Sequence, residues 1–375
     1  DGGDAGEIVG HVQRVDESGR LRRQTTTGWN ARFIRVMEDA NIAAMKQSFL
    51  ASCRHGGPPV QKSKPPPSEI IALAKSIVGS SELFDRAVST TTFLHGHPNI
   101  IMHAQEADTT LKHLFLEFSC RDAYGLKPLN SRLKGASGAR FAVDIGANLG
   151  DFTLAAYGRD PSLTILALEP MPITYLYFRW NLHANNIPII SEEAFANGKR
   201  GGVLPINAAT TSDGRNVTIE FNPKVSGMSR SSASVARDLA LRPVGAFADP
   251  SKVQRLHRGS LDLVRWLERH RVPSIDFLKM DCEGCEHELI PTLSSSGYLN
   301  RTRNFEGEIH RCSRGSQCQF SNYHVRESMR HLCGTFRTST VSKTLHTKPQ
   351  HSSQMSCGWN ASGSYVVDWR VGAVS

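Results

Sequence analysis

Two carboxylates stand at the ends of apolar, strand-like runs, where they could hold a cationic or hydroxyl-bearing ligand. Asp144 ends the run FAVD, and Gly146, Asn148 and Gly150 follow it in the sequence DIGANLGDFT. Glu169 ends a second run, LTILALE. Glycines let the backbone turn sharply and approach a ligand because they carry no Cβ. A strand, a glycine turn and a helix start in this order are typical of the ligand-binding edge of an α/β sheet.

The residue types at this turn favour S-adenosylmethionine over a dinucleotide. A dinucleotide turn reads G-x-G-x-x-G and offers a helix N-terminus to a pyrophosphate. Here Asn148 replaces the middle glycine, and Asp144 would repel a phosphate. S-adenosylmethionine has a cationic sulfonium and no phosphate, and Glu169 could accept hydrogen bonds from both of its ribose hydroxyls. The pattern argues against a nicotinamide-dependent oxidoreductase and predicts a cofactor site formed by Asp144, Gly146, Asn148, Gly150 and Glu169.

A second group of charged residues follows two later strand-like runs. Lys279, Asp281 and Glu283 lie in IDFLKMDCEGCEHEL, and Glu308 and His310 lie in NFEGEIH. Neighbouring strand ends would bring Asp281 together with Glu308 or His310. Such a group could deprotonate a hydroxyl or hold a divalent metal, and the sequence does not choose between these roles.

Cys282 and Cys285 form a C-x-x-C pair inside this second group, a spacing that is found at redox and zinc sites. The sequence holds no second C-x-x-C for a structural zinc. Because the pair flanks a predicted helix start, we expect the two cysteines to fill small sites in the core.

The positions of these residues depend on an alternation of predicted strands and helices. This alternation predicts a mostly parallel sheet with helices on both faces. The expected strands are 140–144, 163–169, 203–208, 216–221, 274–280, 303–310 and 364–369. The expected helices are 151–158, 172–184, 260–270 and 284–295.

The remaining chain is predicted to fall into segments around this sheet. Residues 1–67 form a polar, partly disordered segment with an amphipathic helix between residues 28 and 50, and end in the linker GGPPVQKSKPPP. Residues 68–138 form a helical lead-in, with helices at 68–78 and 109–124. Residues 139–375 form the main domain. This domain contains an insertion at 222–258, expected to be a lid or substrate loop without a clear strand, and an irregular cysteine-bearing tail at 312–363.

Composition sets limits on partners and compartment. The net charge of +9 arises from 44 Lys and Arg against 35 Asp and Glu, without a block of basic residues. We therefore expect a solvated basic surface and no nucleic-acid partner. No apolar run approaches the ~18 residues of a membrane helix, and no signal peptide pattern opens the chain, although a chain that begins with Asp1 could have lost one.

The cysteines and the glycosylation triplets leave the compartment open. Cys318, Cys333 and Cys357 lie in the polar tail, and N-x-S/T triplets occur at Asn216, Asn300 and Asn360. Paired tail cysteines would fit the lumen of the secretory pathway, such as the Golgi, whereas free thiols would fit the cytoplasm. The sequence weighs these two about equally, and it does not indicate an oligomeric state.

Together the motifs resemble the FkbM-type family of S-adenosylmethionine-dependent methyltransferases. The resemblance lies in FAVDIGANLGDFT, ALEPMPITYLYFRWNL, SLDLVRWL, IDFLKMDCEGCEHEL and GEIH, and covers about residues 140–310. It implies a class I methyltransferase fold, Rossmann-like, with a seven-stranded sheet, and methyl transfer to a hydroxyl of a sugar or natural product. It also assigns Lys279, Asp281, Glu283 and Gly284 to the family's second motif and His310 to its last.

Our main hypothesis is therefore O-methylation of a hydroxyl on a glycan or small metabolite. Asp281, His310 and Lys279 are the candidate catalytic residues, and Asp281 with Glu308 would hold any divalent metal. Two alternatives stay open. One is a non-catalytic binding module on a methyltransferase fold, against which the intact motifs argue. The other is a methyltransferase that modifies nucleic acid, for which binding should depend steeply on salt.

Overall fold

The computed structural model divides the chain into two compact units, Asp1–His55 and Gly56–Ser375. The structure describes residues 12–15, 21–24, 60–94, 97–106, 110–111, 140–222, 225–231, 254–308, 328, 331, 345–347, 353–359 and 365–371. In the first unit, β1 (Val12–Val15) pairs antiparallel with β2 (Leu21–Gln24). The helix predicted between residues 28 and 50 lies outside the described residues, as does nearly all of the one predicted at 109–124.

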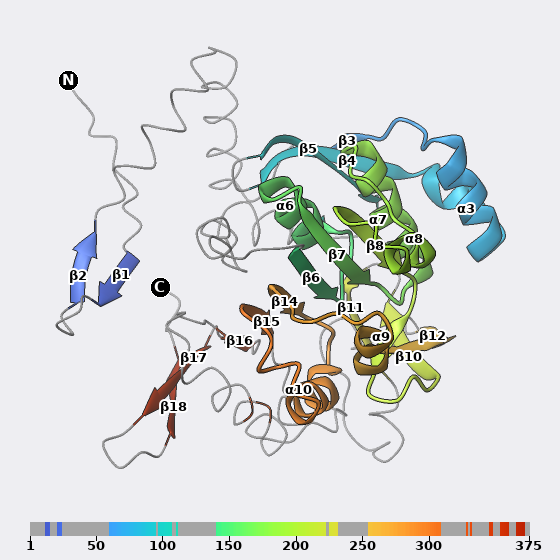
Figure 1. Ribbon diagram of the computed structural model, residues 1–375. Coiled ribbons are helices and arrows are strands. Elements are labelled where there is room, and N and C mark those ends of the chain that lie inside the picture. Colours follow the sequence, from blue (N-terminus) through green and yellow to red (C-terminus); the bar gives the residue numbers. More distant parts are fainter. Residues whose placement is uncertain are drawn as a thin grey trace, which may run out of the picture. The chain divides into compact units, whose positions relative to one another are not determined.

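A mostly parallel sheet forms the centre of the second unit (Figure 1). In spatial order its strands are β8 (Gly202–Ile206), β7 (Leu163–Leu168), β6 (Arg140–Ile145), β14 (Phe277–Met280), β15 (Phe305–Glu308), β16 (Leu345–Thr347), β17 (Ser353–Trp359) and β18 (Tyr365–Val371). Strands from β8 to β16 run parallel, and β17 and β18 pair antiparallel. The predicted α/β class is confirmed, although the sheet has eight strands rather than seven.

The sheet separates two apolar cores, one on each face. Helices α6 (Asp151–Arg159) and α7 (Pro172–Ala184) cover one face, and α9 (Leu263–Arg269) and α10 (Glu286–Ser295) cover the other (Figure 1). Ala142 and Phe277 belong to the first core, whereas Val143 and Leu278 belong to the second. Because side chains alternate along a strand, the charged residues two positions after Ala142 and Phe277 share the α6/α7 face. These residues are Asp144 and Lys279.

The segment predicted as a helical lead-in is only partly helical. The helix α3 (Ser68–Val78) is found, and Gly79 ends it with a left-handed φ of 75°. The following residues form β4 (Ala87–Leu94) and β5 (His97–Gln105). β4 pairs with β5 on one side and with β3 (Gln61–Lys62) on the other, in a three-stranded antiparallel sheet. The helical prediction was wrong here because the Thr-rich and Ile-rich runs favour strands.

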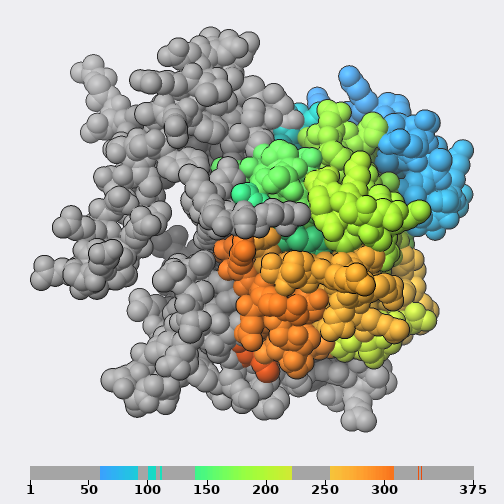
Figure 2. Space-filling model, in the orientation of Figure 1, coloured from blue at the N-terminus to red at the C-terminus, as the bar shows by residue number. Residues whose placement is uncertain are grey.

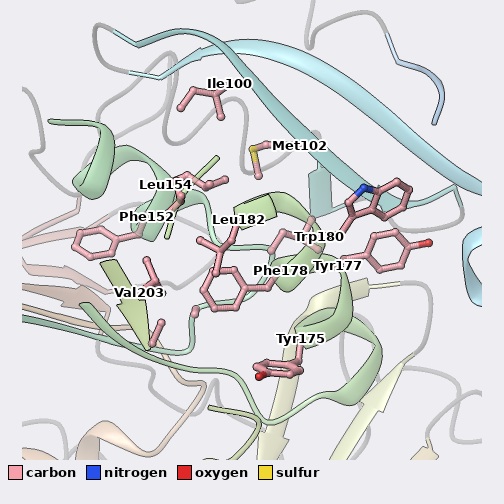
Figure 3. Packing of buried hydrophobic residues seen from close by; sticks show 14 of the residues in the cluster. Ile100, Met102, Phe152, Leu154, Tyr175, Tyr177, Phe178, Trp180, Leu182 and Val203 are labelled. Atoms are coloured by element: carbon pink, nitrogen blue, oxygen red, sulfur yellow. The ribbon is translucent and has the colours of Figure 1, made fainter. Parts of the chain in front are cut away.

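This strand pair packs on α7 through apolar side chains and two asparagines. Ile100 and Met102 of β5 lie over the side chains of α6 and α7 (Figure 3). The side chain of Asn185 accepts a hydrogen bond from the Ile101 N–H (2.9 Å), and that of Asn181 accepts one from the His103 N–H (2.6 Å). These amides therefore satisfy two backbone donors of β5.

The predicted strand at 216–221 exists but does not join the central sheet. It is β10 (Val217–Asn222), and it lies between β11 (Val225–Ser231) and β12 (Gln254–Arg258) in a separate antiparallel sheet. The insertion at 222–258, expected to hold no strand, therefore begins and ends with one. β12 reads QRLHR, with Leu256 as its one apolar residue, so it lacks the apolar pattern from which a strand is recognised.

The tail predicted to be irregular also contributes strands. β16 and β17 extend the sheet beyond β15, while the rest of 312–363 lies almost wholly outside the described residues. Polar sequences such as that of β17, SQMSCGW, form strands when an existing edge offers hydrogen bonds, and this is a non-local cause. Among the described helices, none combines the length and the apolar character that a membrane crossing requires.

Candidate functional site

The glycine turn between β6 and α6 has a backbone that depends on left-handed residues. Gly146 has φ 77°, Asn148 φ 50° and Gly150 φ 91°. The N–H groups of Gly146 and Ala147 both donate to the carbonyl of Leu168 at the end of β7, at 3.0 and 2.9 Å. This ties the turn to the strand end that precedes Glu169.

Gly146 also permits a close backbone contact. A Cβ at this position would lie 1.9 Å from the carbonyl oxygen of Asp281. The Asp281 N–H donates to the carbonyl of Ile145 at 3.0 Å. The loop that carries the predicted catalytic carboxylate therefore lies directly against the predicted cofactor turn.

We expect Gly146→Ala to destabilise the protein more than Gly297→Ala does. Gly297 has nearly the same φ, 76°, but open space around its missing Cβ. Both variants should lose about 1–2 kcal/mol of unfolding free energy, because alanine is disfavoured in the left-handed backbone conformation. Only Gly146→Ala adds a clash with Asp281, which we expect to cost about 1–3 kcal/mol more. Urea unfolding measures both free energies, and equal losses would show that the contact is not tight.

A buried ion pair lies beneath the turn. The parallel register places Lys279 beside Asp144, and the Lys279 ammonium lies 3.2 Å from Oδ1 of Asp144. The ammonium also donates to the carbonyl of Gly146 at 2.5 Å, and Thr153 donates to Oδ2 of Asp144 at 2.6 Å. Asp144 is 0% exposed. Of the predicted site residues, these two therefore support the turn from inside the protein.

The environment keeps Lys279 charged. Burial alone would lower the pKa of its ammonium, but the carboxylates of Asp144, Asp281 and Asp151 raise that pKa above its ordinary value. A charged ammonium can hold both the Asp144 carboxylate and the Gly146 carbonyl. The ion pair thus couples the end of β14 to the turn after β6.

Glu169 and Asn148 come together as the sequence suggests. The Glu169 carboxylate accepts hydrogen bonds from the Asn148 N–H at 2.9 Å and from the Met171 N–H at 2.8 Å. Burial raises the pKa of Glu169 to about 7, although these two hydrogen bonds oppose the shift. Asn207, which the sequence did not single out, donates its side-chain amide to the Glu169 carbonyl at 2.8 Å and fixes the strand end.

Asp281 and the two cysteines occupy the loop between β14 and α10. Asp281 is half buried. Cys282 and Cys285 are joined by a disulfide, and both border the core beneath α9 and α10. The expectation that they only fill core sites is corrected: their spacing and the turn between them bring the sulfurs into bonding distance.

The third predicted group is only partly described. β15 lies next to β14, and the register places Glu306, which is buried, beside Lys279. Glu308 ends β15, but its side chain and all of His310 lie outside the described residues. The register of β16 aligns His346 with Glu308. Sequence reasoning missed His346 because its strand could not be recognised.

A hollow of about 510 Å³ lies at the outer edge of the sheet, beside β8. Its polar lining is Arg179, Ser191, Glu192 and Asn207, and Ile189 and Leu204 belong to its apolar lining. None of the predicted site residues that the structure describes belongs to it. It adjoins the predicted site through Ile206 and Asn207, both of which form hydrogen bonds with the backbone of Glu169. Figure 2 shows the orange surface of the α10 region adjoining the green surface of the β6 to α7 region.

The part of the chain that carries these residues resembles known proteins. A family model described as "Methyltransferase FkbM domain" matches residues 144–332. A protein named "Methyltransferase 1" from Beauveria bassiana (strain ARSEF 2860) is 28% identical over 154 residues, which cover 40% of this chain and 57% of that protein. The chain thus spans less than two thirds of that relative's length. No solved structure gives a significant match.

Proposed function

The chain belongs to the FkbM methyltransferase family, and from this premise we propose that it transfers a methyl group from S-adenosylmethionine to a hydroxyl oxygen of a glycan or small metabolite. One observation carries the proposal. The carbonyl of Asp281 lies so close to Gly146 that no side chain fits between them. The candidate proton acceptor and the candidate cofactor turn are therefore held in one rigid contact.

The residues of the turn fit S-adenosylmethionine. The carboxylates of Asp144, Asp151 and Glu169 lie at or beside the glycine turn, and Lys279 is the base that the structure describes beside Asp144. Such a field favours a cationic ligand over a phosphate. Each oxygen of Glu169 accepts one backbone N–H and keeps a lone pair for a ribose hydroxyl.

When bound, S-adenosylmethionine supplies an electrophilic methyl carbon on a cationic sulfur. The chain's own contribution is to align the acceptor hydroxyl with that carbon, and alignment supplies much of the rate. Asp281, half exposed at the edge of the sheet, would accept the hydroxyl proton, with His310 as a second candidate. A divalent metal held by Asp281 and Glu308 is another form of the same proposal.

Lys279 receives a different role from the one predicted. Its ammonium is bonded to Asp144 and to the Gly146 carbonyl within the protein. It is therefore proposed as a positioning residue that shapes the turn, and the proton transfer is left to Asp281.

Calorimetric titration of the purified chain with S-adenosylmethionine tests the cofactor. Saturable binding is expected, and no heat at millimolar cofactor would end the proposal. Incubation with methyl-labelled cofactor and fractionated cell extract then tests the acceptor. Label in glycans or small hydroxylated metabolites supports O-methylation, whereas label in RNA or DNA would replace that acceptor class. Activity with and without a chelator tests the metal.

Cofactor affinity is expected to rise with pH and to level off above about pH 7, the pKa of Glu169. Ribose hydroxyls donate to the ionised carboxylate more strongly than to the neutral acid. Stability should change in the opposite direction. Because the folded-state pKa is raised from 4.5 to about 7, the folded protein holds an extra proton in that window, and the unfolding free energy falls as pH rises through it.

Glu169→Gln should remove both dependences. Titrations at about pH 6 and about pH 8 bracket the pKa, and Glu193→Gln, at an exposed acid of α8 (Glu192–Ala196), is the control. If affinity changes with pH equally in the two variants, Glu169 does not contact the ribose.

A further inference from the structure

The loop between β14 and α10 carries a disulfide for which the proposed methyl transfer has no use. Cys282 and Cys285 lie on either side of Glu283 and Gly284, and both cysteines are half buried. Because both residues keep part of their surface exposed among the described residues, we expect a small thiol in solution to reach the sulfurs. Cys285 is also the N-cap of α10, so the bond joins the helix start to the residue that follows Asp281.

The backbone between the two sulfurs has an unfavourable conformation. Glu283 has φ 54° and Gly284 has φ 122°. The left-handed region is crowded for a residue with a Cβ, such as Glu283. A covalent bond between the ends of the loop keeps this conformation populated. Breaking that bond is therefore expected to release the loop.

A buried carboxylate beside the cysteine pair has a hydrogen-bond donor in both redox states. Oε2 of Glu286 lies 3.2 Å from Sγ of Cys282 and accepts a hydrogen bond from the Gly284 N–H at 2.9 Å. Glu286 is 0% exposed. When the disulfide is reduced, the Cys282 sulfur gains a hydrogen that this carboxylate can accept. Reduction therefore gives the buried Glu286 carboxylate one more hydrogen-bond donor, the Cys282 thiol, and adds no unpaired charge to the interior of the protein.

The loop is connected to the cofactor turn. Asp281, the neighbour of Cys282, donates its N–H to Ile145 and places its carbonyl against Gly146. A change in the backbone of residues 281–285 therefore moves both the candidate proton acceptor and the glycine turn.

We propose that Cys282 and Cys285 form a thiol–disulfide exchange site, and that the disulfide form holds loop 281–285 in the conformation that binds S-adenosylmethionine. With glutathione as the reactant, one glutathione thiolate attacks a sulfur, the S–S bond breaks, and the released sulfur takes a proton from solvent. A second glutathione thiolate then displaces the first as glutathione disulfide, and the second protein sulfur is protonated. Two electrons pass to the protein, and glutathione disulfide reverses the reaction.

Thiol trapping tests the exchange without reference to the proposed function. The full chain is equilibrated in glutathione buffers of graded ratio with a chelator, alkylated and digested. Cleavage after Lys279 and Arg301 gives a peptide that contains Cys282 and Cys285 and no other cysteine. Both cysteines should gain label together, as one two-electron couple. A pair that stays bonded in excess glutathione, or stays labelled in excess glutathione disulfide, would overturn the site.

Zinc binding is the competing chemistry, because Cys282, Cys285 and Glu286 form the one group of metal-type ligands found among the described residues. Adding Zn²⁺ to the reduced chain distinguishes the two. If zinc protects both thiols from alkylation and also blocks reoxidation by glutathione disulfide, the pair is a metal site and the exchange proposal is wrong. Labelling and reoxidation that are unchanged by zinc support exchange.

The second half of the proposal rests on the proposed function and has its own readouts. We expect reduction to weaken S-adenosylmethionine binding about tenfold, within the ordinary range of coupling between two sites, and to speed hydrogen exchange in residues 145–150. The Cys282→Ser/Cys285→Ser variant should show the weaker affinity in either buffer, whereas Cys53→Ser should respond as the natural chain does. Equal affinity and equal exchange in both states would refute the coupling. If neither redox state binds the cofactor, the proposed function fails. The hydrogen exchange of residues 145–150 in the two states then still tests whether the disulfide is coupled to the turn.

Discussion

Asp281→Asn is expected to lower the rate of methyl transfer by about 10²–10⁴-fold, the usual contribution of a general base, with little change in cofactor affinity. Asparagine has the size of aspartate but cannot accept the hydroxyl proton. The Asp281 backbone groups, which contact Ile145 and Gly146, remain in the variant. Turnover with labelled cofactor measures the rate, and calorimetry measures the affinity.

Asp85→Asn is the matched control, because Asp85 is an exposed acid at the end of the short helix Glu82–Phe84. It removes the same charge and should leave turnover unchanged. If Asp281→Asn turns over as fast as the control variant, Asp281 takes no part in the chemistry. Recovery of the variant at high concentrations of a divalent metal would instead identify Asp281 as a metal ligand, since added metal cannot replace a proton acceptor.

Local patterns were sufficient for the elements that carry the site. The apolar runs that end at Asp144 and Glu169 form β6 and β7, and the helix predicted at 172–184 has the same bounds as α7. Pro172 opens that helix, and buried residues recur along it. Each of these signals comes from residues that are close together in the sequence, so each can be recognised from the sequence alone.

The parts that were missed depend on contacts between residues far apart in sequence. β5 obtains part of its backbone hydrogen bonding from Asn181 and Asn185 on α7, and β16 obtains its own from β15. No local periodicity reports such partners. A Thr-rich run such as that of β4 does favour a strand by its composition alone, and that signal could have been used.

The roles of Asp144 and Lys279 could not be read from the sequence for a related reason. Both residues precede strand ends, which suggested contact with ligands. Their pairing requires β14 to lie next to β6 in one particular register, although 134 residues separate the Lys279 nitrogen from its Ile145 acceptor. A shift by one residue would send Lys279 to the opposite face of the sheet. Register therefore decides whether this lysine faces Asp144.

Lys279→Met is expected to reduce the free energy of unfolding near neutral pH by about 3–5 kcal/mol, the usual cost of breaking a buried ion pair. Methionine approximates the length of lysine but leaves the Asp144 carboxylate buried with Thr153 as its described hydrogen-bond donor. Arg303→Met is the control. It breaks a pair in which Asp276 is buried but Arg303 is half exposed, so the expected loss is about 1 kcal/mol or less. Urea unfolding measures both.

The double variant Lys279→Met/Asp144→Asn distinguishes a structural role of the ion pair from a direct role of Lys279 in methyl transfer. It leaves no buried charge at this position, so we expect it to recover most of the lost stability, and the double-mutant cycle then gives the coupling energy of the pair. The Gly146 carbonyl still lacks its ammonium donor. Cofactor affinity should therefore stay below that of the natural chain while the rate at saturating cofactor approaches the natural value. A double variant that binds the cofactor normally but cannot turn over would instead show that Lys279 acts on the substrate, because loss of turn geometry alone weakens binding before it affects the chemical step.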